Sequence, residues 1–74
     1  MPRPAKFKQV VKVLNSLGYF EVRQKGSHVI FENSKGDIAV SPNHGSKDIT
    51  FGLLKKICDD INISTKDFWK ALDK

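Results

Sequence analysis

The sequence contains a single cysteine, Cys58, so the chain can form no internal disulfide and no thiolate cluster. It contains only two histidines, His28 and His44, and neither stands at metal-ligand spacing to the other or to the cysteine, which argues against a zinc site. Cys58 falls at helical spacing among apolar residues. We therefore expect a buried structural thiol and no metal or other cofactor.

Long apolar runs are absent as well. No stretch approaches the roughly 20 residues of a membrane-spanning helix, and the first residues lack the apolar core of a signal peptide. We therefore expect a cytoplasmic protein with no membrane partner. A length of 74 residues predicts one small domain, residues 1–74, with little room for an enclosed substrate pocket. An active site would then lie on an open surface, which suits a polymeric ligand.

Basic residues are concentrated at one end of the chain. The net charge is +5, and residues 1–25 carry six basic side chains against one acidic one, whereas residues 26–74 are balanced. Such an asymmetry is the expected footprint of a polyanion, although the charge alone fits a solvated lysine face equally well. Lys8 and Lys12 stand four residues apart and would form a basic ridge on the first helix, pointing away from its apolar stripe.

The spacing of apolar residues predicts three helices and three strands. The first helix carries apolar residues from Phe7 to Leu17 and ends at Gly18; the second covers about residues 50–61, and a short third begins near Ser64. β-formers predict strands over about residues 19–24, 28–32 and 37–41, separated by turn residues. This α-β-β-β-α order with an extra C-terminal helix predicts an α+β fold, the layout of double-stranded-RNA-binding domains.

The predicted strands would form an antiparallel sheet with the helices on one face. Strict alternation would place one set of apolar residues against the helices, namely Phe20, Val22, Val29, Phe31, Ile38 and Val40. His28, Ile30 and Glu32 would share the opposite face, which stays open to a partner. The second helix would bury Leu53, Leu54, Ile57, Cys58 and Ile61.

The tripeptide Gly26-Ser27-His28 lies between the first two predicted strands. Glycine permits a tight connection, and His28 then stands at the mouth of the second strand with Arg23 and Lys25 close by in sequence. A histidine with a pKa of about 6.5 can exchange protons near neutral pH, and basic neighbours attract phosphate. RNA cleavage requires both groups, although a lone histidine near a turn is more often structural or solvated.

Several motifs in a fixed order resemble one known family. The order is a helix ending in Leu17-Gly18-Tyr19, then Arg23-Gln24-Lys25-Gly26-Ser27-His28, then Ser41-Pro42-Asn43-His44-Gly45, then a helix opening Ile49-Thr50-Phe51-Gly52-Leu53-Leu54. This pattern is similar to the HicA (YcfA-like) toxins, the small mRNA-cleaving halves of toxin–antitoxin pairs. The resemblance covers roughly residues 5–68.

The resemblance implies a double-stranded-RNA-binding-like fold, ribonuclease activity on mRNA and a HicB antitoxin as partner. The catalytic histidine of the family carries over to His28, and Gly26 and Ser27 match the motif around it. His44 matches the second histidine-bearing element, and its role stays open.

The chemistry of RNA indicates how such a site would work. The 2′-hydroxyl is the nucleophile, so His28 would act as general base while Lys25 and Arg23 bind the phosphate, with no metal required. His44, Lys25 or water would protonate the leaving oxygen. Two alternatives remain: a non-catalytic RNA-binding module that uses the Lys8 and Lys12 ridge, and a protein-interaction domain that docks a partner on the open sheet face.

Overall fold

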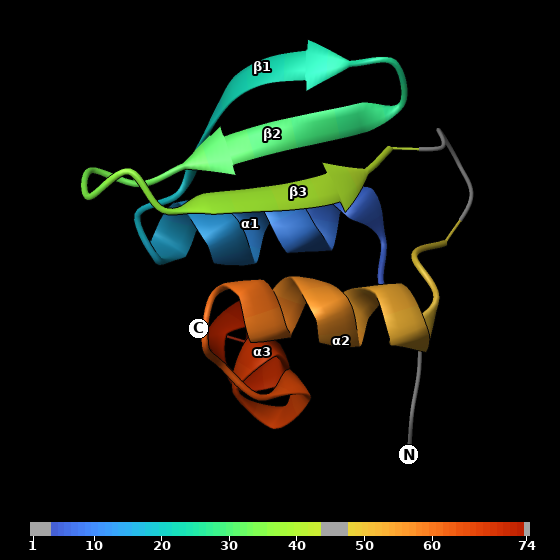
Figure 1. Ribbon diagram of the computed structural model, residues 1–74. Coiled ribbons are helices and arrows are strands. Elements are labelled where there is room, and N and C mark those ends of the chain that lie inside the picture. Colours follow the sequence, from blue (N-terminus) through green and yellow to red (C-terminus); the bar gives the residue numbers. More distant parts are fainter. Residues whose placement is uncertain (1–3, 44–47, 74) are drawn as a thin grey trace.

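The computed structural model describes residues 4–43 and 48–73 (Figure 1). Three strands form one antiparallel sheet in the order β1-β2-β3, and helices pack against one of its faces. The architecture is the predicted α+β fold, with the element order of double-stranded-RNA-binding domains and one further helix. Along the chain the elements are α1 (Phe7–Ser16), β1 (Phe20–Lys25), β2 (His28–Glu32), β3 (Ile38–Pro42), α2 (Phe51–Asp60) and α3 (Thr65–Leu72).

Helix α1 ends as its sequence predicts. Gly18 adopts a φ of +90°, which glycine reaches at no steric cost, and the N–H of Tyr19 donates to the carbonyl of Leu14 at 2.8 Å. The buried face of the helix differs at two residues from the predicted stripe of Phe7, Val10, Val11, Leu14 and Leu17. Val13 is buried, whereas Leu17 is exposed because it stands at the C-cap, beyond the last full turn.

Helices α2 and α3 both begin at a hydroxyl cap. The Thr50 side chain accepts from the N–H of Leu53, and the Ser64 side chain accepts from the N–H of Asp67 at 3.0 Å. The stretch before α2 is held by an antiparallel bridge in which Ala5 and Ile49 exchange main-chain hydrogen bonds of 2.9 and 2.7 Å. The predicted buried stripe of α2 is confirmed except at Leu53, which is exposed.

The central strand β2 alternates as predicted. Val29 and Phe31 are each 1% exposed and join the core, whereas His28 and Ile30 belong to the opposite face. The core combines these two residues with apolar side chains from every helix, from β3 and from the segments next to the helices, namely Ala5, Val10, Val13, Leu14, Tyr19, Ala39, Ile49, Leu54, Ile57, Cys58, Ile61 and Phe68.

The predicted facing of β1 and β3 is wrong. Phe20, Val22 and Ile38 are 58%, 54% and 47% exposed, and Val40 is also exposed. The small residues Ala39 and Ser41 face the core in their place. Large apolar side chains in these two strands therefore lie outside the core.

The register of the sheet explains this facing. Val40 pairs with Ile30, and Glu32 pairs with both Ile38 and Phe20. Directly opposed residues of an antiparallel pair share a face, so these apolar side chains lie on the face of His28. The helices cover β2 and β3, whereas all six residues of the edge strand β1 are exposed, and a bulge between Glu21 and Arg23 shifts its register.

Candidate functional site

The connection between β1 and β2 is a two-residue turn formed by Gly26 and Ser27. Gly26 has a φ of +60°, and Ser27 does not share this positive φ, which is the pattern of a type II′ hairpin turn. The Gln24 side-chain amide donates to the Gly26 carbonyl at 3.0 Å and supports the turn. The turn makes His28 the first residue of β2, as predicted.

His28 lies between two strands on the open face of the sheet. It pairs with Lys25 on β1 and with Pro42 on β3, and Arg23 pairs with the next open-face residue, Ile30. Side chains at opposed positions stand about 5 Å apart at Cβ, so Lys25 flanks the imidazole directly and Arg23 follows one position along. All three polar side chains are exposed.

The segment after β3 is attached to the same turn. The N–H of Asn43 donates to the carbonyl of Ser27 at 2.6 Å, which fixes the end of β3 beside the start of β2. Ser27 is half-buried by this arrangement. His44, the second histidine predicted for the site, lies outside the described residues.

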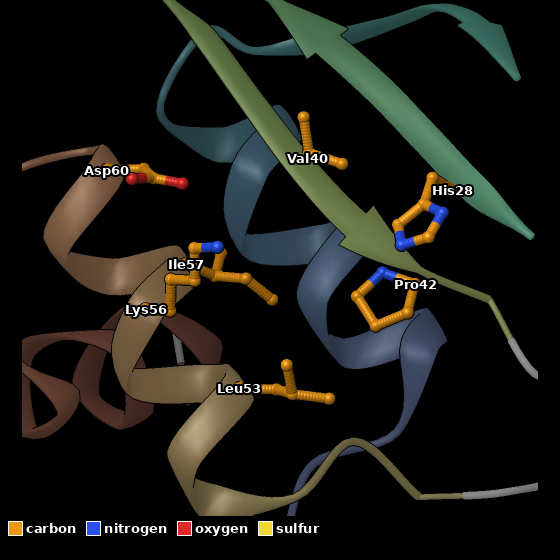
Figure 2. Close-up of a pocket in the computed structure, with 7 residues that line it drawn as sticks. All are labelled: His28, Val40, Pro42, Leu53, Lys56, Ile57 and Asp60. Carbon is orange, nitrogen blue, oxygen red and sulfur yellow. The ribbon is translucent and has the colours of Figure 1, made fainter. Parts of the chain in front are cut away.

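A pocket of about 480 Å³ opens beside His28, a volume within the usual range of small-ligand sites (Figure 2). Helix α2 runs alongside the edge strand β3, so the pocket has one wall from the sheet and one from the helix. The lining residues are His28, Val40 and Pro42 from the sheet and Leu53, Lys56, Ile57 and Asp60 from α2.

The helix wall of this pocket is not among the predicted site residues. Leu53 was predicted to be in the core, and Lys56 and Asp60 were given no role. A signal was nevertheless present, because positions 53, 56, 57 and 60 have the spacing of one helical face. That face carries two apolar and two charged residues, a mixture that is typical neither of a core nor of a fully solvated surface.

The structure does not bring the predicted basic ridge to this site. Lys8 and Lys12 are exposed on α1, and α1 packs on the face of the sheet opposite to His28. Lys6, another contributor to the basic excess, forms an ion pair of 2.6 Å with Asp48. The cations nearest to His28 along the sheet are therefore Lys25 and Arg23.

Cys58 belongs to the core and not to this site. The side chain is 1% exposed, which confirms the predicted buried thiol. Burial, with a smaller contribution from the negative charge of Asp59, raises the pKa of Cys58 to about 11. Within residues 4–43 and 48–73, no three histidine, cysteine or carboxylate side chains gather as metal ligands.

Comparison with known proteins identifies one family. A family model described as the HicA toxin of bacterial toxin–antitoxin systems matches residues 7–63, which include the turn at Gly26, His28 and the whole of α2. A comparison with curated proteins found no match to the chain. Across the part of the chain that the structure describes, no helix has the length and apolar character needed to cross a membrane.

Proposed function

Because the chain belongs to the HicA toxin family of bacterial toxin–antitoxin systems, we propose that it is a metal-independent endoribonuclease that cleaves mRNA with His28 as its catalytic residue. One observation supports this most directly. The imidazole lies on an open sheet face, directly opposite a lysine and beside a pocket, where a single RNA strand can reach it. The site is accessible to a polymer because, among the described residues, the helices pack on the opposite face and only α2 borders the site along β3.

The reaction uses the nucleophile that RNA carries. His28, in its neutral form, removes the proton from the 2′-hydroxyl, and the 2′-oxygen forms a bond to the adjacent phosphorus as the bond to the 5′-oxygen breaks. Lys25 and Arg23 hold the phosphate and stabilise the charge that develops on its oxygens. Lys25, His44 or water protonates the leaving 5′-oxygen. The products are a 2′,3′-cyclic phosphate and a 5′-hydroxyl.

The proposed mechanism predicts a slow enzyme. One well-placed acid or base contributes on the order of 10²–10⁴-fold to a rate, and this site relies on one histidine with exposed cations around it. Slow cleavage is sufficient for a toxin, since an mRNA needs to be cut only once to be lost.

A toxin of this family has an antitoxin as its partner. We propose that this antitoxin is a HicB-type protein that covers the open face and His28. Support comes from the exposed apolar side chains on and beside this face, among them Phe20, Ile38 and Val40. Apolar patches of this kind mark protein-binding surfaces. The cations at Arg23 and Lys25 would attract carboxylates of the partner, which would then compete with RNA phosphate.

The proposed function is tested by incubating the purified chain with an mRNA transcript and mapping the ends that appear. We expect fragments with 5′-hydroxyl and 2′,3′-cyclic phosphate ends, formed equally well in excess EDTA. RNA that is retarded on a gel but stays intact would instead indicate a non-catalytic RNA-binding module. Activity that is lost in EDTA and restored by magnesium or manganese would contradict the metal-independent mechanism.

A further inference from the structure

We propose that the pocket between β3 and α2 is a nucleobase subsite that holds the base next to the cleaved phosphate and discriminates between bases by their hydrogen-bonding edge. The inference rests on the proposed function, because it places an RNA phosphate at His28. A catalytic histidine alone does not select an RNA sequence, whereas a base-binding subsite beside it does. Asp60 and Lys56 of α2 make that choice.

The position of the pocket indicates a nucleotide as its ligand. His28 is part of its wall, so a strand whose 2′-hydroxyl meets the imidazole has its neighbouring base within reach of the pocket. The opening lies on the same face as Lys25 and Arg23, which attract the phosphates on either side. In single-stranded RNA the bases can turn out of the stack and enter such a site.

The lining matches the two flat faces of a base. Val40 and Pro42 of the sheet lie across from Leu53 and Ile57 of α2, and Figure 2 shows these side chains on opposite sides of the pocket. Val40 and Leu53 remain 37% and 40% exposed, so a base between them would cover apolar surface that the fold leaves open. Base-binding sites commonly hold an extruded base between apolar side chains in this way.

The two charged residues match the hydrogen-bonding edge of a base. Lys56 and Asp60 stand one helical turn apart on the pocket wall, and among the described residues neither forms an ion pair. A lysine only donates hydrogen bonds and an ionised aspartate only accepts them. Every base presents a donor beside an acceptor on its pairing edge, so Asp60 can pair with the donor and Lys56 with the acceptor. Cytosine and adenine carry an exocyclic amine beside a ring nitrogen that accepts, whereas uracil and guanine carry a carbonyl beside a ring N–H that donates. The order of donor and acceptor is therefore reversed between these two pairs of bases, and the fixed positions of Asp60 and Lys56 favour one order over the other.

The chain offers matched controls for a direct test. Lys55 and Asp59 precede the two pocket residues in sequence and lie instead beside a second hollow on another side of α2. Cleavage maps on a transcript of mixed sequence would be compared for Asp60→Asn and Lys56→Ala against Asp59→Asn and Lys55→Ala. Each pair of variants makes the same change of charge on the same helix.

We expect the unaltered chain to prefer one of the two pairs of bases, cytosine and adenine or uracil and guanine, at one fixed position beside the broken bond. Asp60→Asn should reduce that preference by roughly 5- to 150-fold, the usual loss for a base-edge contact, because an amide also donates to a carbonyl. Cleavage itself should continue, and the Asp59→Asn and Lys55→Ala variants should keep the original map. A map that Asp60→Asn and Lys56→Ala leave unchanged would overturn the subsite while the nuclease assignment stands.

A binding measurement decides the subsite without relying on cleavage. The ¹⁵N-labelled His28→Ala variant would be titrated with tetranucleotides of cytidine, adenosine or uridine. Amide shifts at Leu53, Lys56 and Asp60 that differ between uridine and the other two oligonucleotides support the subsite. Shifts confined to other parts of the surface, or equal for all three oligonucleotides, overturn it. If the unaltered chain cleaves no RNA, the proposed function fails, and the titration still shows whether the pocket binds a base.

Discussion

The main-chain N–H of Asn43 donates a 2.6 Å hydrogen bond to the carbonyl of Ser27. This bond joins two sequence elements that lie far apart in the chain, the Gly-Ser-His turn and the Pro-Asn segment after β3. His28 and Pro42 face each other in register next to it. The two elements thus form one structural unit, and the catalytic residue of the proposed mechanism stands where they meet.

The turn glycine provides a test of how His28 is held in place. We expect Gly26→Ala to lower the free energy of unfolding by about 1–2 kcal/mol, because Gly26 has a φ of +60° that an L-residue adopts only with strain. No atom would clash with the added methyl group, so the cost is conformational. Gly52→Ala, in α2 with no positive φ, should be neutral or stabilising. Urea unfolding of both variants measures the difference, and equal effects would contradict this account of the turn.

The buried thiol of Cys58 should make the stability of the fold decrease at high pH. Burial raises the pKa of Cys58 from an ordinary value of 9.0 to about 11, so between these values the unfolded chain loses a proton that the folded chain keeps. Stability therefore falls as pH rises through this window, by at most about 3 kcal/mol from this group. Cys58→Ala should lack that component and show a shallower decline in urea unfolding between pH 8 and 11. Parallel declines in the two proteins would contradict the prediction.

The salt dependence of RNA binding shows which surface of the protein the RNA contacts. Each phosphate contact contributes roughly 0.7 to the slope of log affinity against log salt for single strands. We expect Arg23→Gln with Lys25→Gln to flatten the slope by about 1.4, since both residues lie on the face of His28. The ridge of Lys8 and Lys12 stays a prediction, and their double glutamine variant should flatten the slope less because α1 packs on the other face. A larger effect from the ridge would move the RNA path to α1.

Hydrogen exchange tests how the antitoxin silences the toxin. In a complex with a HicB-type partner, we expect the amides of residues 26–30 to become protected, because the partner would cover the open face. Added antitoxin should stop cleavage, and excess RNA should slow formation of the complex. Protection confined to the helical side, with residues 26–30 unaffected, would contradict direct occlusion and indicate an indirect mode of inhibition.

Local sequence predicted the features that depend on local geometry. The limits of β2, the glycine stop after α1 and the cap at Ser64 follow from spacing and from backbone preference at single residues. The facing of β3 does not, because Ile38 and Val40 look like core residues by alternation alone. Ala39 and Ser41 face inward where the helices pack on the sheet, and that packing is set by elements distant in sequence.

The candidate site likewise has one part that the sequence predicts and another part that depends on tertiary packing. The position of His28 beside Lys25 follows from a two-residue turn, so the sequence was sufficient to predict it. The pocket next to it depends on where α2 lies relative to β3, and this position is set by tertiary packing across the core. Leu53 was therefore assigned to the wrong side of its helix.

The central claim is that His28 carries the chemistry, and the rate of RNA cleavage by His28→Ala tests it most directly. The variant should keep the circular dichroism and melting temperature of the unaltered chain, because the side chain is exposed. Glu32→Gln, on the same strand and face, serves as the control and should retain activity. We predict that His28→Ala forms 2′,3′-cyclic phosphate ends at least about 10²-fold more slowly than the unaltered chain. A folded His28→Ala protein that cleaves at the original rate would contradict the account.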